Sequence, residues 1–84
     1  MKSDRSLRLF EEACKYIPGG VNTSIRILDP PIVFTRAMGS RIYDADDNEY
    51  IDYHAAFGPP ILGHNNPEVN RRVMEIMNEI DLVG

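Results

Sequence analysis

The chain has 84 residues, and thirteen acidic side chains against nine basic ones give it a formal net charge of -4. This length leaves room for one small domain at most, and a hydrophobic fraction of 43% is that of an ordinary folded chain, not of a disordered one. The single cysteine, Cys14, excludes an internal disulfide and suits a reducing compartment, so we expect a cytoplasmic protein.

Membrane, secreted and nucleic-acid-binding classes are disfavoured. No apolar run approaches the roughly 18 residues that a membrane-spanning helix needs, and the first ten residues carry charges where a signal peptide has its apolar core. The arginines are scattered along an acidic chain and form no basic stripe. We therefore expect neither a nucleic acid nor a membrane as a partner.

The first predicted element is a helix over residues 3–17. Ser3 is its expected cap, and Pro18 with the two glycines that follow ends it, because proline cannot continue a helix and glycine accepts left-handed geometry. Residues 21–31 show no clean period, so an irregular segment is expected there. The helix has one apolar stripe, whose members recur three or four residues apart: Leu7, Phe10, Cys14 and Ile17.

Three short strands are predicted next, over residues 32–35, 41–43 and 49–53, because these segments are rich in β-branched and aromatic side chains. A turn at 38–40 and a polar turn at 44–48 connect them into an antiparallel meander. A sheet of this size needs cover for its apolar face, and one amphipathic helix cannot cover both sides.

The acidic cluster around the second turn resembles a calcium-binding loop only in part. Asp44, Asp46, Asn48 and Asp52 alternate in the way that calcium-binding loops use. Counted from Asp44, however, the sixth position holds Glu49 where such a loop needs glycine. Because Asp and Asn tolerate turn geometry, the cluster predicts a polar hairpin turn and no metal site.

A second helix is predicted over residues 67–80, after a loop rich in glycine and proline over 54–66. Asn66 as cap, Pro67 at the first helical position and an acid in the first turn form a strong start signal. No terminal element is predicted for residues 81–84. The whole pattern predicts an α+β chain of helix, three-stranded meander and helix. The second helix has its own apolar stripe, formed by Val69, Val73, Ile76 and Ile80 and widened by Met74 and Met77.

The residues by themselves predict no catalytic or metal site. His54, His64 and Cys14 are the only soft metal ligands, and they lack the paired spacing of a zinc site. The only lysines, Lys2 and Lys15, lie at the N-terminus and in the first helix, where neither is expected to be buried for Schiff-base chemistry.

Four motifs, taken in order, resemble the N-terminal segment of one enzyme family. They are PGGVNTSIR at 18–26, DADDNEYID at 44–52, FGP at 57–59 and ILGHNNPEV at 61–69. The match is to the class III, fold-type-I pyridoxal-phosphate (PLP) aminotransferases, in the branch of glutamate-1-semialdehyde aminomutase. It runs over nearly the whole chain from about residue 7 onward.

The resemblance implies that residues 1–84 are the N-terminal part of the small domain of a fold-type-I PLP-dependent transferase, inactive as this piece alone. It places the Schiff-base lysine, the acid facing the pyridine nitrogen and the phosphate-binding loop beyond Gly84. PLP is therefore expected in the full-length enzyme and not on this piece. The implied partners are the remainder of the chain, its dimer mate and a small amino or keto acid. Amino transfer between two molecules and amino migration within one both remain open.

Three substrate-binding residues follow from the resemblance. Arg26, together with Thr23, corresponds to the arginine and hydroxyl that bind the substrate carboxylate in aminomutase-like members, and a guanidinium suits a carboxylate because it offers a planar fork. Phe57 corresponds to an aromatic residue that lines the substrate pocket and is often tryptophan in relatives. His64 is expected to orient its loop. The alternative function is a free-standing protein-interaction module derived from such a segment.

Overall fold

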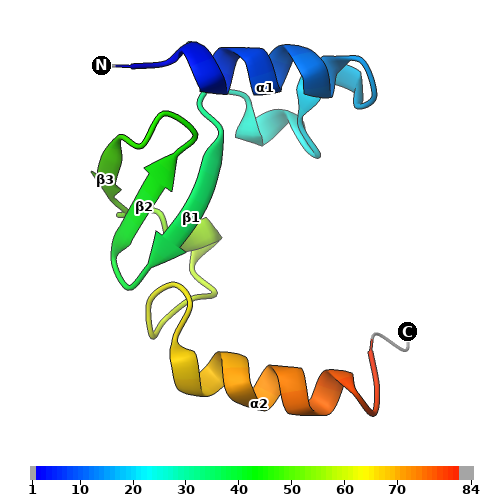
Figure 1. Cartoon of the computed structure of the whole chain (residues 1–84), viewed down its shortest axis with the longest axis vertical. Coiled ribbons are helices and arrows are strands. Elements are labelled where there is room, and N and C mark those ends of the chain that lie inside the picture. The colour runs from blue at the N-terminus through cyan, green and yellow to red at the C-terminus, as the bar shows by residue number, and fades with distance from the viewer. Residues whose placement is uncertain (1, 82–84) are drawn as a thin grey trace.

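The computed structural model describes residues 2–81, so the expectation for the last residues of the chain lies largely outside the described part. A three-stranded sheet lies between two helices, which extend from its opposite ends (Figure 1). This arrangement confirms the predicted α+β class. The elements in chain order are α1 (Asp4–Cys14), β1 (Phe34–Met38), β2 (Arg41–Asp44), β3 (Glu49–Ile51) and α2 (Pro67–Met77), with three-residue turns at Pro18–Gly20, Ser24–Arg26 and Ala55–Phe57.

Both helices are shorter than the sequence predicted. Helix α1 ends at Cys14, and Ile17 already has an extended backbone, with φ of -122° and ψ of 119°. The cause is Pro18, because a proline disfavours helical geometry in the residue before it. Helix α2 ends at Met77, where the side chain of Asn78 donates to the carbonyl oxygen of Met74 at 3.1 Å. Such a bond competes with the backbone pairing that would continue a helix.

The predicted residue occupies the N-cap of α1, but another side chain makes the capping hydrogen bonds. Ser3 occupies the N-cap position, but its side chain makes no capping hydrogen bond. Instead, the carboxylate of Asp46 accepts hydrogen bonds from the backbone N–H groups of Arg5 (2.8 Å) and Ser6 (2.9 Å). An acid at this position also matches the positive end of the helix dipole. Ser3 is therefore the N-cap residue, as predicted, but the capping hydrogen bonds come from Asp46 in the turn between β2 and β3.

The sheet is the predicted antiparallel meander, with strand order β1-β2-β3. Strand β1 begins at Phe34, later than predicted, because the N–H of Val33 donates to the hydroxyl oxygen of Ser6 at 3.1 Å. That bond ties the N–H of Val33 to α1, while the carbonyl oxygen of Val33 accepts a hydrogen bond from the N–H of Ala45, directly after β2, at 2.8 Å. Strand β3 ends at Ile51, since the side chain of Asp52 begins the next turn.

The polar turn between β2 and β3 is built around one buried carboxylate. Asp44 is 2% exposed and accepts hydrogen bonds from the N–H groups of Asp46 and Asn48, the Asn48 amide and the Tyr50 hydroxyl. Burial by itself would raise the pKa of Asp44, but these hydrogen bonds lower it below its ordinary value. Between residues 2 and 81, no group of three or more His, Cys, Asp or Glu side chains could hold a metal ion.

The chain leaves most of its apolar surface uncovered. Among residues 2–81, Ala45 is the only hydrophobic residue that is buried. The accessible area is 6910 Å², whereas a compact monomer of 9.5 kDa exposes roughly 5,000 Å². The radius of gyration is 15.1 Å, against about 12 Å for a compact domain of this length. The sheet and helices therefore hold together without a hydrophobic core of their own.

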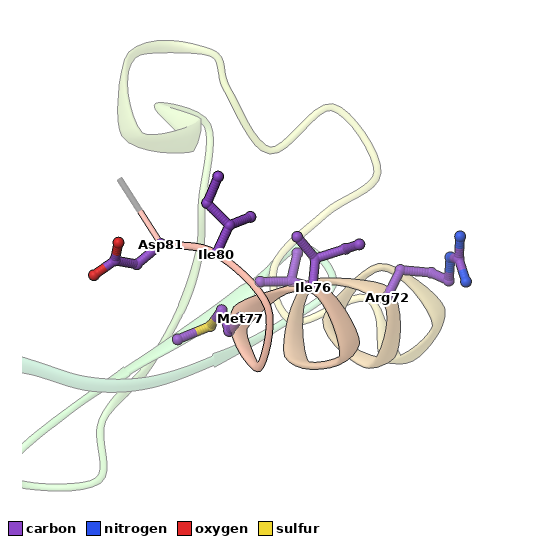
Figure 2. Close-up of a pocket in the computed structure, with 6 residues that line it drawn as sticks. Arg72, Ile76, Met77, Ile80 and Asp81 are labelled. Atoms are coloured by element: carbon purple, nitrogen blue, oxygen red, sulfur yellow. The ribbon is translucent and has the colours of Figure 1, made fainter. Parts of the chain in front are cut away.

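Helix α2 carries a large part of this open surface. A shallow groove runs along its apolar side into the residues that follow it, as Figure 2 shows. The described part of the chain contains no helix that is long and apolar enough to cross a membrane. The groove is lined by Arg72, Val73, Ile76, Met77, Ile80 and Asp81.

Candidate functional site

Arg26 lies at the end of a short turn that Thr23 begins. The hydroxyl oxygen of Thr23 accepts a hydrogen bond from the N–H of Ile25 at 3.3 Å, and its carbonyl oxygen accepts one from the N–H of Arg26 at 3.0 Å. A hydroxyl that caps its own turn in this way fixes the local backbone. The turn Ser24–Arg26 thus gives order to a segment that the sequence predicted to be irregular.

The structure brings Arg26 and Phe57 together, although they are far apart in the sequence. The guanidinium carbon of Arg26 lies 5.5 Å from the centroid of the Phe57 ring, within the range of a cation–π contact. The ring of His54 meets the same phenyl ring edge to face, with centroids 4.2 Å apart. Two of the three predicted substrate-binding residues are therefore in contact, and Thr23 belongs to the same turn as Arg26.

The guanidinium of Arg26 has no carboxylate partner among residues 2–81. Four other arginines, by contrast, form exposed ion pairs: Arg36 with Asp47, Arg41 with Glu49, and Arg71 and Arg72 with Glu75. Arg26 itself is exposed, and within residues 2–81 its guanidinium interacts with the phenyl ring alone. Its hydrogen-bond donors are consequently free to receive an external carboxylate.

Phe57 is displayed by a turn with unusual backbone geometry. Three consecutive residues that carry side chains have positive φ: Ala55 (49°), Ala56 (47°) and Phe57 (70°), and Gly58 follows at 112°. Left-handed geometry costs a residue with a Cβ about 1–2 kcal/mol. Such a conformation persists where the surrounding contacts impose it, and it is common at functional sites.

Asp52, directly after β3, forms hydrogen bonds with the first residues of this turn. One carboxylate oxygen, Oδ1, accepts hydrogen bonds from the N–H groups of His54 (2.9 Å) and Ala55 (3.0 Å). The other oxygen, Oδ2, lies 2.5 Å from Nε2 of His64. The hydrogen bond with His64, followed by the two backbone bonds, lowers the pKa of Asp52 to about 2. Asp52 is thus a charged anchor with both oxygens in use.

His64 is itself fixed to the sheet by its backbone. Its N–H donates to the carbonyl oxygen of Gly39 at 2.8 Å, and its own carbonyl oxygen accepts from the N–H of Gly39 at 2.9 Å. In the sequence, Asp52 is one member of an acidic cluster, and its contact with His64 was not predicted. An Asp placed two residues before a Gly/Pro-rich loop was the available signal, since Asp commonly accepts from the backbone two residues on.

The described residues do not fit a PLP site. Lys15 is exposed, with its Nζ 3.0 Å from a carboxylate oxygen of Glu12. Lys2 is exposed as well. The N-termini of α1 and α2, where a phosphate group could bind, already receive the side chains of Asp46 and Asn66. These residues offer the cofactor neither an imine lysine nor an open helix N-terminus.

Comparison with solved structures defines the class of protein to which this arrangement belongs. A β-phenylalanine aminotransferase from Variovorax paradoxus superposes with a TM-score of 0.82 and 33% identity, over 98% of this chain and 20% of that chain. A transaminase solved with PLP bound gives a TM-score of 0.89 at 26% identity, over 100% of this chain and 20% of that chain. The fold is that of a segment of a PLP-dependent transaminase.

The family model of the class-III aminotransferases matches residues 24–83, and the chain belongs to that family. A glutamate-1-semialdehyde 2,1-aminomutase from Pelotomaculum thermopropionicum is 47% identical over 81 residues, which are 92% of this chain and 19% of that protein. Its counterpart from Psychrobacter arcticus is 51% identical over 71 residues, 80% of this chain and 16% of that protein. These findings confirm the family resemblance.

The chain spans about one fifth of the length of the curated relatives that it matches, in their N-terminal part. The comparisons do not support the alternative of a free-standing interaction module.

Proposed function

We propose that residues 1–84 form the N-terminal part of the small domain of a PLP-dependent class-III aminotransferase or aminomutase, and that Arg26 binds the carboxylate of a small amino or keto acid substrate. The observation that carries the proposal is the contact between Arg26 and Phe57. Two residues assigned separately to the substrate pocket meet at 5.5 Å, and no acid pairs with the guanidinium in the described part of the chain.

Each of the three residues has a distinct role in the proposed carboxylate subsite. Arg26 supplies a planar fork of donors that matches the two oxygens of a carboxylate. Thr23 holds the turn through its oxygen, which leaves its O–H free to donate to the same carboxylate. Phe57 forms an apolar wall that excludes water from one side, and its ring face favours the position of the cation.

The chemistry at the amino group belongs to the remainder of the protein in this proposal. When bound, PLP supplies the electron sink for transformations at the carbon that bears the amine. The lysine and phosphate-binding groups for it lie outside residues 2–81. The same proposal places the enzyme in the cytoplasm, as a dimer in which the rest of the chain and the dimer mate cover the open apolar faces of this segment.

Substitution of Arg26 in the full-length enzyme tests the subsite. A charge-assisted hydrogen bond contributes about 1.5–3 kcal/mol, so Arg26→Ala should lower kcat/KM for a carboxylate substrate by roughly 10- to 150-fold. Thr23→Val should cost less, because it removes a neutral hydrogen bond. Kinetics with an amine that lacks the carboxylate should hardly change in either variant.

Arg8→Ala is the matched control, since Arg8 is also exposed and forms no ion pair within the described residues, and its loss changes the net charge equally. It should leave both substrates unaffected. Equal losses for carboxylate and carboxylate-free substrates in Arg26→Ala would assign Arg26 a structural role and overturn the proposal.

A further inference from the structure

We propose that Asp52 and His64 are positioning residues for the carboxylate subsite, and that they hold the turn at 54–57 in the left-handed form that places Phe57 beside Arg26. This inference rests on the proposed function of Arg26 and adds the device that shapes its pocket. Neither residue is expected to touch the substrate carboxylate.

The first argument is the backbone of the turn. Ala55 and Ala56 have no side-chain reason to adopt positive φ, and neither is a glycine that would adopt it freely. The bonds within the turn are the N–H of Phe57 to the carbonyl of His54 at 3.2 Å and the N–H of Gly58 to the carbonyl of Ala55 at 2.6 Å. An outside anchor is needed to select this conformation over relaxed alternatives.

The second argument is that the two carboxylate oxygens of Asp52 have different partners. Its Oδ1 accepts from the first two N–H groups of the turn, and its Oδ2 meets His64. The Asp52 side chain is 9% exposed, compared with 47% for Glu49, the first residue of the strand that Asp52 follows. The carboxylate therefore joins the turn to His64 at a site largely removed from water.

The third argument is that His64 connects the turn to the hairpin between β1 and β2. Its backbone pairs in both directions with Gly39, at the hairpin between β1 and β2, while the N–H of Asp52 donates to the carbonyl of Ser40 at 2.8 Å in the same hairpin. The turn at 54–57 is consequently fixed to the sheet at two points. A shift of either point would move the Phe57 ring relative to Arg26.

The test uses the full-length holoenzyme and compares KM and kcat for a carboxylate substrate and for an amine without the carboxylate. If the turn is no longer held, one residue that leaves its left-handed conformation lowers the population of the native turn by about 5- to 30-fold. Asp52→Ala should therefore raise KM for the carboxylate substrate by about that factor, with kcat and the carboxylate-free amine much less affected. His64→Ala should give the same split with a smaller increase, because the bonds to Oδ1 remain.

Asp52→Asn is the conservative variant that separates turn geometry from charge. Its amide oxygen still accepts from His54 and Ala55, so KM should stay within roughly 2- to 5-fold of the parent. Glu49→Gln is the matched control, since it converts a neighbouring acid that pairs with Arg41 and does not contact the turn. It should leave both constants unchanged.

The outcomes separate this inference from the proposed function. If Arg26→Ala shows carboxylate selectivity but neither Asp52→Ala nor His64→Ala does, the positioning role is refuted and the subsite survives. If Arg26→Ala shows no selectivity, the subsite itself fails. If Asp52→Ala does not fold, the test rests on His64→Ala, which should raise KM for the carboxylate substrate and change kcat and the carboxylate-free amine much less. An Asp52→Asn enzyme as impaired as Asp52→Ala would also refute the role in the turn.

Discussion

Separated from the remainder of its protein, the 84-residue chain should not form a stable, cooperatively folded monomer. Its accessible area of 6910 Å² exceeds that of a compact monomer of the same mass by roughly 1,900 Å². That excess lies on one chain, and it is more than twice the roughly 800 Å² that each partner of a standard protein–protein interface buries. The area that this chain lacks cover for therefore exceeds one partner's share of a standard interface, and small domains have only marginal stability to begin with.

The expected result for the isolated chain is partial unfolding or self-association. Urea unfolding followed by circular dichroism should be broad, and sedimentation should show association as concentration rises. A monomer with sharp, well-dispersed amide resonances and a cooperative melt would refute the reasoning, because it would show that a polar framework with one buried apolar side chain is sufficient.

A single substitution on α2 tests whether the apolar face of this helix is covered in the full-length protein. Ile76 is 48% exposed, so covering the rest of its side chain would contribute about 0.7–1.5 kcal/mol, half the value for full burial. Ile76→Ala should lower the melting temperature of the full-length protein and hardly change the helical signal of the isolated chain. Glu75→Ala removes exposed ion pairs. It should have equally small effects on the melting temperature of the full-length protein and on the helical signal of the isolated chain. An Ile76→Ala protein with an unchanged melting temperature would show that this face stays open.

Three further predictions follow from particular contacts. The pKa of Asp52 is lowered to about 2, so its contribution to the free energy of unfolding should be complete above about pH 4 and be lost as the pH falls towards 2. Acid titration of the full-length protein should show a weaker loss of stability over this pH range in Asp52→Asn. Gly63→Ala should destabilise more than Gly19→Ala in thermal melts, because both have positive φ but a Cβ at Gly63 would lie 2.9 Å from the Cα of Gly39. Titration of the isolated chain with PLP should give no saturable imine absorbance, and a stoichiometric band that survives Lys2→Ala would contradict this prediction.

The parts of the fold that the sequence predicted correctly are those with local causes. The start of α2 was predicted because its signals are adjacent in the chain, and the structure confirms the cap: the side chain of Asn66 accepts from the N–H groups of Glu68 and Val69, both at 3.1 Å. The meander was predicted for the same reason, since turn residues alternate with short β-branched segments. Asp47 has a φ of 64° in the turn where an Asp-tolerant position was expected.

The parts that the sequence did not predict depend on contacts across the chain. Ser3 has the sequence signal of an N-cap, but the capping bonds come from Asp46, which lies 41 and 40 residues further along the chain than Arg5 and Ser6. No local pattern reveals a contact between residues so far apart in the sequence. The positive φ of Ala55 and Ala56 is equally hidden, because alanine carries no signal for left-handed geometry. The resemblance pointed to Arg26 and Phe57 separately, and their contact emerged only in three dimensions.

Three aspartates replace a hydrophobic core in organising this segment. Asp44 gathers the turn between β2 and β3, Asp46 caps α1, and Asp52 fixes the turn that carries Phe57, each by accepting backbone N–H bonds close to a strand end. Hydrogen bonds are directional, whereas burial of apolar area is not. A framework of this kind sets the orientation of individual turns without using the apolar faces of the helices. Under the proposed function, the rest of the protein covers those faces and stabilises the segment, and the segment supplies Arg26 and Phe57 in a fixed arrangement.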